Sequence, residues 1–182
     1  MNESSKILKT KRLLIKPFSE KHLTPRYVGW LNNSALMRHS EQRHKIHTLE
    51  MCRLYWRSFN NSANLLWAIE DVTNGYGHIG NINAYVDTHN KIADIGVLVG
   101  EVNVRGYGYG YEAFKGVSEY LFQNMEIRKI VAGTVSANSS MIKLMNKMKM
   151  REDGIRRRHY LIEGEEVDII HMALFKQDIS AE

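Results

Sequence analysis

The sequence predicts an α/β (α+β) domain with about seven strands in one mixed central sheet and about four helices against it. Segments with apolar residues at helical spacing alternate with short apolar runs that end in turn residues. Neither an internal repeat nor a linker rich in Gly, Ser or Pro divides the 182 residues. We therefore expect one domain over residues 9–176, with residues 1–8 and 177–182 as flexible termini.

The first third of the chain predicts one strand and two helical segments. Arg12–Lys16 is rich in Leu and Ile and ends at a proline, which is typical of a short strand. The segment from Ser19 to about Arg38 has apolar residues at helical spacing, interrupted by a proline and an Asn-Asn-Ser sequence. Thr48–Phe59 opens with a residue that caps helices, and its apolar residues recur three and four positions apart.

Strands dominate the rest of the chain. Leu65–Glu70 and His78–Val86 flank a stretch of turn residues, which favours an antiparallel hairpin. Ile92–Val99 is almost wholly apolar after Asp94, so we expect a central strand that is covered on both faces. The later elements are a helix over Tyr111–Asn124, a strand over Lys129–Ser136, a helix over Asn138–Lys149 and a hairpin of Ile155–Ile162 and Glu166–Phe175.

Composition excludes several classes of protein. The single cysteine, Cys52, excludes an internal disulfide and a multi-cysteine zinc site, and we expect no metal site. The N-terminus lacks the apolar core of a signal peptide, and no stretch approaches the ~18 apolar residues of a spanning helix. We therefore expect a cytoplasmic protein with no membrane partner.

A glycine-rich loop, Arg105-Gly106-Tyr107-Gly108-Tyr109-Gly110, connects a predicted strand to a predicted helix. Its glycines let the backbone approach a ligand, and the N–H groups at the helix start favour phosphate oxygens. The loop is neither a dinucleotide fingerprint nor a P-loop, because Tyr111 and Glu112 replace the residues that those motifs require. On the pattern alone, a purely structural tight turn is the alternative.

The Arg-x-x-Gly-x-Gly pattern between a buried strand and a helix resembles the acetyl-CoA pyrophosphate loop of the GNAT N-acetyltransferase superfamily. The order of elements matches from Lys9 to Lys176. The opening TKRLLIKPFSEKHL and the stretch from Asn138 to Lys147 look like the Rim-type subgroup, which includes ribosomal-protein N-terminal acetyltransferases. The resemblance implies direct transfer of acetyl from acetyl-CoA, as co-substrate, to a primary amine.

The resemblance also implies cofactor contacts. These map onto Val99, Arg105, Gly106, Tyr107, Gly108, Tyr109, Gly110, Asn138 and Lys143. A backbone amide at Leu98 or Val99 is expected to stabilise the oxyanion of the transition state. Capping of the following helix is an equal alternative for Asn138. The net charge of +5 arises between Lys143 and His159, where it suits the phosphates of a cofactor better than nucleic acid.

The chain departs from the family where a general acid is usual. Met141 and Met145 stand where the Rim-type subgroup often has a serine and the family a tyrosine, and neither can donate a proton. The proton for the departing thiolate would then come from water or from another side chain, with Ser139, Ser140 and Tyr160 as candidates. Lys149 and Met150 replace the glycine and aromatic residue that usually close this helix, which leaves its end uncertain.

For the general base we rank Asp94 ahead of His78 and His159. A carboxylate beside a cleft can have a raised pKa, and histidine titrates in the required range. The alternatives are that Asp94 caps a turn and that each histidine is a packing or surface residue.

The acceptor should enter opposite acetyl-CoA. Candidate contacts are Arg38, His39 and Arg43 before the second helix, Asn83 and Tyr85, which share a strand face with Asn81, and His159. That strand face could equally be the solvent face of the sheet.

We expect a small-molecule acceptor such as an amino sugar or a nucleotide-linked amino sugar, because the segment before Thr48 is rich in Arg, His and Ser. A protein N-terminus is the alternative acceptor, and a non-catalytic acetyl-CoA-binding module is the alternative of another class. We expect a monomer or homodimer and no nucleic acid partner, since no nucleic-acid-binding motif accompanies the basic charge.

Overall fold

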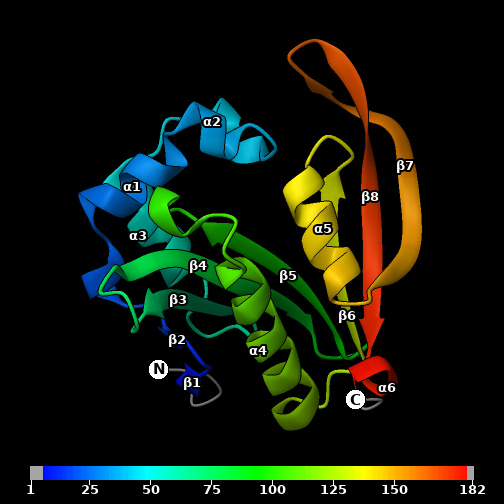
Figure 1. Ribbon diagram of the computed structural model, residues 1–182, viewed down its shortest axis with the longest axis horizontal. Coiled ribbons are helices and arrows are strands. Elements are labelled where there is room, and N and C mark those ends of the chain that lie inside the picture. Colours follow the sequence, from blue (N-terminus) through cyan, green and yellow to red (C-terminus); the bar gives the residue numbers. More distant parts are fainter. Residues whose placement is uncertain (1–5, 180–182) are drawn as a thin grey trace.

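A single eight-stranded sheet forms the centre of the computed structural model, which describes residues 6–179 (Figure 1). Residues 1–5 and 180–182, part of the predicted flexible termini, lie outside the described residues. The strands are β1 (Leu8–Lys9), β2 (Leu13–Pro17), β3 (Leu65–Asp71), β4 (Gly77–Asp87), β5 (Ile92–Val99), β6 (Lys129–Val135), β7 (Arg151–Ile162) and β8 (Glu165–Phe175). Their order is β1-β2-β3-β4-β5-β6-β8-β7; β5 and β6 are parallel and the other neighbours antiparallel.

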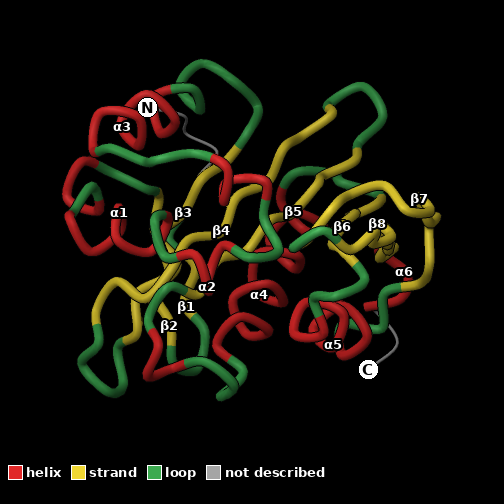
Figure 2. Tube along the Cα trace, turned by 90° about the horizontal axis from the view of Figure 1, so that it is seen from above, coloured by secondary structure: helices red, strands yellow, loops and turns green. Residues whose placement is uncertain are grey.

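Helices cover both faces of the sheet (Figure 2). They are α1 (Pro25–Leu31), α2 (Ser34–Met37), α3 (Leu49–Arg57), α4 (Tyr109–Asn124), α5 (Ser139–Lys147) and α6 (Lys176–Ile179), with 3-10 turns η1 (Glu20–His22), η2 (Glu41–His44) and η3 (Val102–Val104). α4 packs on the large core with Trp67 and Phe114, and α1 and α3 enclose a second cluster around Phe18 and Tyr27. No helix within residues 6–179 is both long and apolar enough to cross a membrane.

The predicted fold class and the seven predicted strands are confirmed, with shifted ends. The eighth strand, β1, begins at Leu8, inside the predicted N-terminal tail, and pairs with β2. The segment from Ser19 to Arg38 is not one interrupted helix, because Thr24 and Asn33 each cap a new one through a side-chain oxygen. β7 begins at Arg151, four residues earlier than predicted.

The parallel pair β5–β6 is short. It extends from Ile92–Lys129 to Asp94–Val131, and the rest of β5 pairs with β4 alone. The prediction that β5 is covered on both faces is wrong: Ala93 and Ile95 are buried, whereas Asp94 on the opposite face is exposed. The two strands therefore diverge after Asp94, and the edge of β5 that faces β6 is left without a partner strand from there to Val99.

The β7–β8 hairpin projects beyond the rest of the sheet (Figure 1). It turns at Glu163 and Gly164, which both have positive φ, as a two-residue hairpin turn requires. Between Arg156 and Tyr160, β7 contains two residues more than the opposing stretch of β8. Such a bulge bends a strand, and Asp168 fixes it by accepting hydrogen bonds from the Arg158 N–H and the Arg157 guanidinium.

Candidate active site

The glycine-rich loop ends in a left-handed turn at the start of α4. Gly106 and Gly108 both have φ of 81°, and Gly108 is the N-cap. The first backbone hydrogen bond of α4 runs from the Glu112 N–H to the Gly108 carbonyl. The N–H groups of the first turn have no intrahelical acceptor, and no side chain among the described residues caps them. They form a site suited to an anion such as phosphate.

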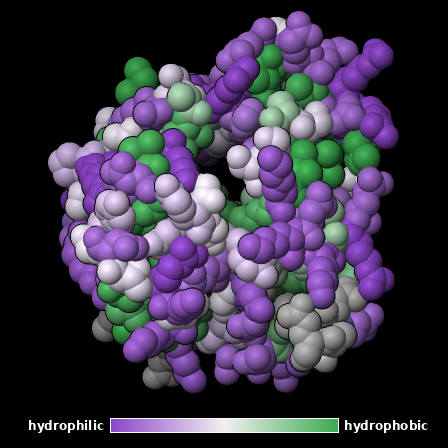
Figure 3. All heavy atoms as spheres, viewed as in Figure 1, coloured by the Kyte–Doolittle hydropathy of each residue, from purple (hydrophilic) through white to green (hydrophobic). Residues whose placement is uncertain are grey.

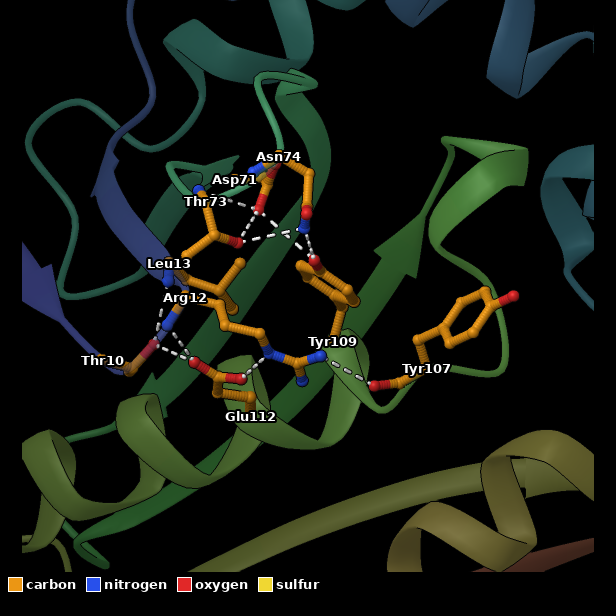
Figure 4. A network of polar contacts seen from close by, with 9 residues as sticks. All are labelled: Thr10, Arg12, Leu13, Asp71, Thr73, Asn74, Tyr107, Tyr109 and Glu112. Atoms are coloured by element: carbon orange, nitrogen blue, oxygen red, sulfur yellow. Dashed lines mark hydrogen bonds and ion pairs between the residues drawn. The ribbon is translucent and has the colours of Figure 1, made fainter.

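Arg12, at the start of β2, clamps this loop from behind (Figure 4). Its Nη1 donates to the Tyr107 carbonyl at 3.0 Å and its Nε to Glu112 at 2.7 Å. The guanidinium carbon lies 4.0 Å from the centre of the Tyr109 ring. Glu112 also accepts from Thr10 at 2.6 Å, so the loop, α4 and the N-terminal segment hold one another in place.

Only the backbone of Tyr109 is available to a ligand at the loop, because its ring points into the protein. Its side chain is buried, and its hydroxyl donates to Asp71 at 3.3 Å and accepts from Asn74 at 2.7 Å (Figure 4). The β3–β4 turn therefore anchors the loop. Of the loop residues predicted to contact a cofactor, Tyr107 is exposed, whereas the Arg105 guanidinium folds back onto the Gly100 carbonyl at 2.7 Å.

A groove of about 410 Å³ continues from the loop along α4. Its lining includes Lys9, Arg12, Lys115 and Lys147 beside Tyr107 and Gly108. The Lys147 ammonium lies 4.2 Å from the centre of the Tyr111 ring. Lys143, the predicted contact on α5, lies one turn earlier on the helix, outside this lining. Glu112 and Glu119 also line the groove and pair with Arg12 and Lys115, so Lys9 and Lys147 are the cations best suited to a second phosphate.

Asn138 caps α5, as one of its two predicted roles requires. Its Oδ1 accepts from the Met141 N–H at 3.2 Å, and its Nδ2 donates to Thr134 at 3.0 Å. Met145 is fully buried, in keeping with its apolar side chain. Lys149 has φ of 58° and takes the left-handed position that closes the helix, so the uncertain end is well defined.

Beside the loop, β5 and β6 diverge and leave a gap in the sheet. Figure 3 shows a hollow near the middle of the molecular surface. The Lys91 carbonyl accepts from the Arg128 N–H on the β6 side, whereas the Leu98 carbonyl lies against Gly80 of β4. Because successive residues of a strand direct their backbone groups to opposite neighbours, Val97 and Val99 face the gap. By this alternation the Leu98 amide faces β4, so of the two predicted donors only Val99 faces the gap, and Val97 joins it.

Polar residues follow the open face of β4 and β5 beside the gap. Asn83 pairs across the strands with Gly96, and Tyr85 with Asp94. The Asn83 amide lies over Gly96, in the space that a Cβ would fill. The Tyr85 hydroxyl is 3.1 Å from that of Tyr55 on α3. The predicted residues Asn83, Tyr85 and Asp94 thus share one face of the sheet, and we call the open space over this face the cleft.

Asp94 is solvent-exposed, and its carboxylate makes no hydrogen bond within residues 6–179. The protein around it raises the pKa of its carboxyl by desolvation, and the nearby His171 opposes this rise. Asp94 lies three residues from Val97, which is about 10 Å along a strand. A proton passing between the two positions would require an intervening water.

His78 does not suit the role of base. Its ring lies against those of Phe18, His22, Tyr27 and Trp30. Its Nε2 is 2.9 Å from Asn81 Oδ1, and desolvation lowers its pKa to about 4. These contacts indicate a packing role, in which the imidazole orients Asn81. His159 is exposed on β7 beside Tyr160, with 5.2 Å between the ring centres.

Arg38 and Arg43 reach across the cleft to the tip of the hairpin. The Arg38 guanidinium pairs with Glu163 at 2.7 Å, and Arg43 donates to the Leu161 carbonyl at 3.0 Å. Desolvation lowers the pKa of His39, and the positive charges of Arg38 and Arg43 lower it further. Both arginines, predicted as acceptor contacts, are therefore engaged with the protein itself.

Three residues of this site were missed by sequence reasoning: Arg12, Tyr55 and Lys147. Lys147 follows Lys143 by one helical turn, which is a readable signal. Tyr55 belongs to the apolar pattern that predicts its helix, so nothing in the sequence distinguished its hydroxyl as part of a site. Arg12 contacts Glu112 across 100 positions, so no local pattern marks it.

Comparison with known proteins identifies a family model. The model described as "Acetyltransferase (GNAT) domain" matches residues 12–151. The chain is 28% identical over 93 residues to the protein of Bacillus licheniformis called "Uncharacterized N-acetyltransferase p20". That match covers 51% of this chain and 52% of the relative, so the chain spans about half the length of that relative.

Solved structures share the fold. Spermidine N-acetyltransferase from Vibrio cholerae, in complex with CoA and spermine, has a TM-score of 0.80 at 16% identity, covering 92% of this chain and 98% of that one. RimL, a ribosomal L7/L12 alpha-N-protein acetyltransferase in complex with coenzyme A, also has a TM-score of 0.80, at 15% identity over 93% and 98% of the two chains. The likeness to both supports the fold alone.

Proposed function

The chain belongs to the GNAT acetyltransferase family, and from this premise we propose that it is an acetyl-CoA-dependent N-acetyltransferase that acts on a small-molecule primary amine. One observation carries the proposal: a loop of unpaired N–H groups at the start of α4 lies beside a gap with free backbone groups in the sheet. Acetyl-CoA, when bound, supplies the thioester that the amine attacks.

The residues of the loop and gap fit this co-substrate. The N–H groups at the start of α4 suit a diphosphate, and the lysines of the neighbouring groove suit a further phosphate. Val97 and Val99 offer the gap a row of backbone donors and acceptors, which suits an arm that itself contains amide groups. Their N–H groups are our candidates for stabilising the oxyanion.

Asp94 is the proposed base, acting through water. Its carboxylate is solvent-exposed, and desolvation raises its pKa despite the opposing charge of the nearby His171. His78 is too enclosed for this role. For the departing thiolate we propose a proton from water, because both methionines on α5 lack one to give.

The proposed acceptor is an amino sugar or a nucleotide-linked amino sugar. The amides of Asn81 and Asn83 and the hydroxyl of Tyr85 suit sugar hydroxyl groups. The Arg, His and Ser residues before α3 also favour such an acceptor, although the Arg38 and Arg43 guanidinium groups already contact the hairpin. A protein N-terminus, as the Rim-type resemblance implies, is the alternative acceptor.

Purified protein mixed with acetyl-CoA and a panel of amines should release free thiol and yield an acetylated product. The panel should contain glucosamine, a nucleotide-linked amino sugar, a linear polyamine and a peptide with a free N-terminus. Turnover of a sugar amine above the others would support the proposal. Tight acetyl-CoA binding without turnover of any amine would instead identify a non-catalytic module.

A further inference from the structure

The acceptor cleft is closed at one rim by two contacts between segments more than 100 residues apart. The first joins Arg38 to Glu163 at 2.7 Å, and the second joins the Arg43 guanidinium to the Leu161 carbonyl at 3.0 Å. We call this pair of contacts the rim bridge. One end follows α2, on the side of β4, and the other is the hairpin tip, beyond β6 and β8. The rim bridge must therefore pass over β5 and β6, where the sheet diverges.

The hairpin is built to hold this position. Its tip is a tight two-residue turn, which fixes the direction of Glu163. The bulge between Arg156 and Tyr160 bends the outer half of the hairpin, and Asp168 ties the bulge by two hydrogen bonds of 2.7 and 2.8 Å. The curvature that brings the tip to α2 is thus specified by the hairpin itself.

The two contacts differ in strength. The Arg38 and Glu163 side chains are 52% and 67% exposed, and ion pairs at such exposure contribute little. The Arg43 side chain is 15% exposed and also bonds Glu41 and the Ser40 carbonyl. Arg43 is therefore the firm side of the rim bridge, whereas the Arg38 contact can open at low cost.

We propose that the rim bridge determines acceptor size: closed, it admits a compact amine to the cleft and excludes an extended polypeptide. The inference rests on the function proposed above and names the residues that set its acceptor class. A polypeptide would have to lie along the cleft between α2 and the hairpin, where the rim bridge stands. Arg38, Arg43 and Glu163 are specificity-determining residues rather than contacts for the reacting atoms.

An accessibility measurement tests this without catalysis. In a Cys52→Ser background, Asn83→Cys places one thiol on the cleft floor. The rate of each reagent with this thiol is divided by its rate with a free thiol in solution. With the rim bridge intact, this relative rate should be at least about tenfold higher for iodoacetamide than for a polymer-linked maleimide. Arg43→Ala, which removes the firmer contact, and Asp168→Ala should each abolish most of that difference, and Glu163→Gln, which removes the weaker contact, should reduce it. Glu165→Gln, which removes a carboxylate from the same tip, should preserve it.

Exchanging the two charges distinguishes loss of the ion pair from general damage to the fold. Arg38→Glu alone should admit the polymer reagent, and Arg38→Glu combined with Glu163→Arg should exclude it again. In the transfer assay, the same single variants should raise the ratio of peptide to sugar-amine kcat/KM by about tenfold. Equal modification by both reagents in the intact protein would overturn the size filter. Absence of any acetyl transfer would instead overturn the proposed function and leave the accessibility result standing.

Discussion

Gly108 is the residue on which the cofactor loop depends most directly. Its φ of 81° is in the left-handed region, where a residue with a Cβ costs about 1–2 kcal/mol. Gly108→Ala should shift the loop and weaken acetyl-CoA binding by about tenfold, as measured by calorimetry. Gly164→Ala, at φ of 87° in the hairpin turn, is the matched control. It should lower stability comparably and leave the affinity for acetyl-CoA unchanged.

Asp94 can be tested by the pH dependence of turnover. A base must be ionised to act, so kcat should fall as the pH drops through the raised pKa of this carboxyl. Asp94→Asn should lower kcat by about 10²–10⁴-fold, the usual contribution of a general base, and remove that limb of the profile. Acetyl-CoA affinity should not change. A variant that keeps the wild-type kcat would eliminate Asp94 as the base.

Lys149 shows how an element can end at an unexpected residue. Its N–H bonds the Asn146 carbonyl and the Met150 N–H bonds that of Met145, which together form a Schellman motif. A lysine occupies the left-handed position that glycine favours. Lys149→Gly should therefore raise the free energy of unfolding by about 0.5–1 kcal/mol, measured by denaturant titration. Lys143→Gly, in the middle of the same helix, should lower it by about 1 kcal/mol.

At the scale of elements, sequence patterns predicted those helices and strands whose position depends on local features such as caps, apolar spacing and turn residues. The cap at Thr48, the apolar spacing of α3 and the turn residues before β4 identified those elements correctly. They failed for β5, because an apolar strand beside a gap has the same composition as one covered on both faces. Burial depends on where β6 diverges, and no residue within β5 encodes that.

The candidate site likewise contains some features that follow from local sequence and others that depend on contacts between distant residues. The loop glycines and the polar face of β4 are local patterns, and sequence reasoning identified both. The clamp by Arg12 and the rim bridge join residues 100 or more positions apart, so only the folded chain brings them together. Arg38 and Arg43 stay predicted acceptor contacts, and their partners on the hairpin were not predictable from local sequence.

At the scale of the whole molecule, one buried group and two half-buried groups couple stability to pH. Desolvation lowers the pKa of His22 and that of His78, the latter to about 4. Desolvation alone would raise the pKa of Glu70, but hydrogen bonds to Lys16 and His22 outweigh it and lower that pKa to about 2. In all three cases the unfolded chain binds protons first, so acid favours unfolding.

The free energy of unfolding should therefore fall as the pH drops below about 6.5, first through the histidines and then, between about 4.5 and 2, through Glu70. His78→Gln should flatten the decline above pH 4, and Glu70→Gln the decline below it. His44→Gln, at an exposed position, is the control. Urea titrations at a series of pH values measure this, and parallel declines in all variants would contradict the assignment.

The shortness of the β5–β6 pairing also has a mechanical consequence. Three residue pairs are all that connect these two strands in the sheet, so the molecule has a seam between β1–β5 on one side and β6–β8 on the other. Amides that border the seam lack an internal acceptor and should exchange with deuterium faster than their neighbours in β4. A ligand that fills the seam would pair with those amides and join both sides into one cooperative unit. Protection of the Val97 and Val99 amides from exchange thus offers a direct readout of occupancy, independent of turnover.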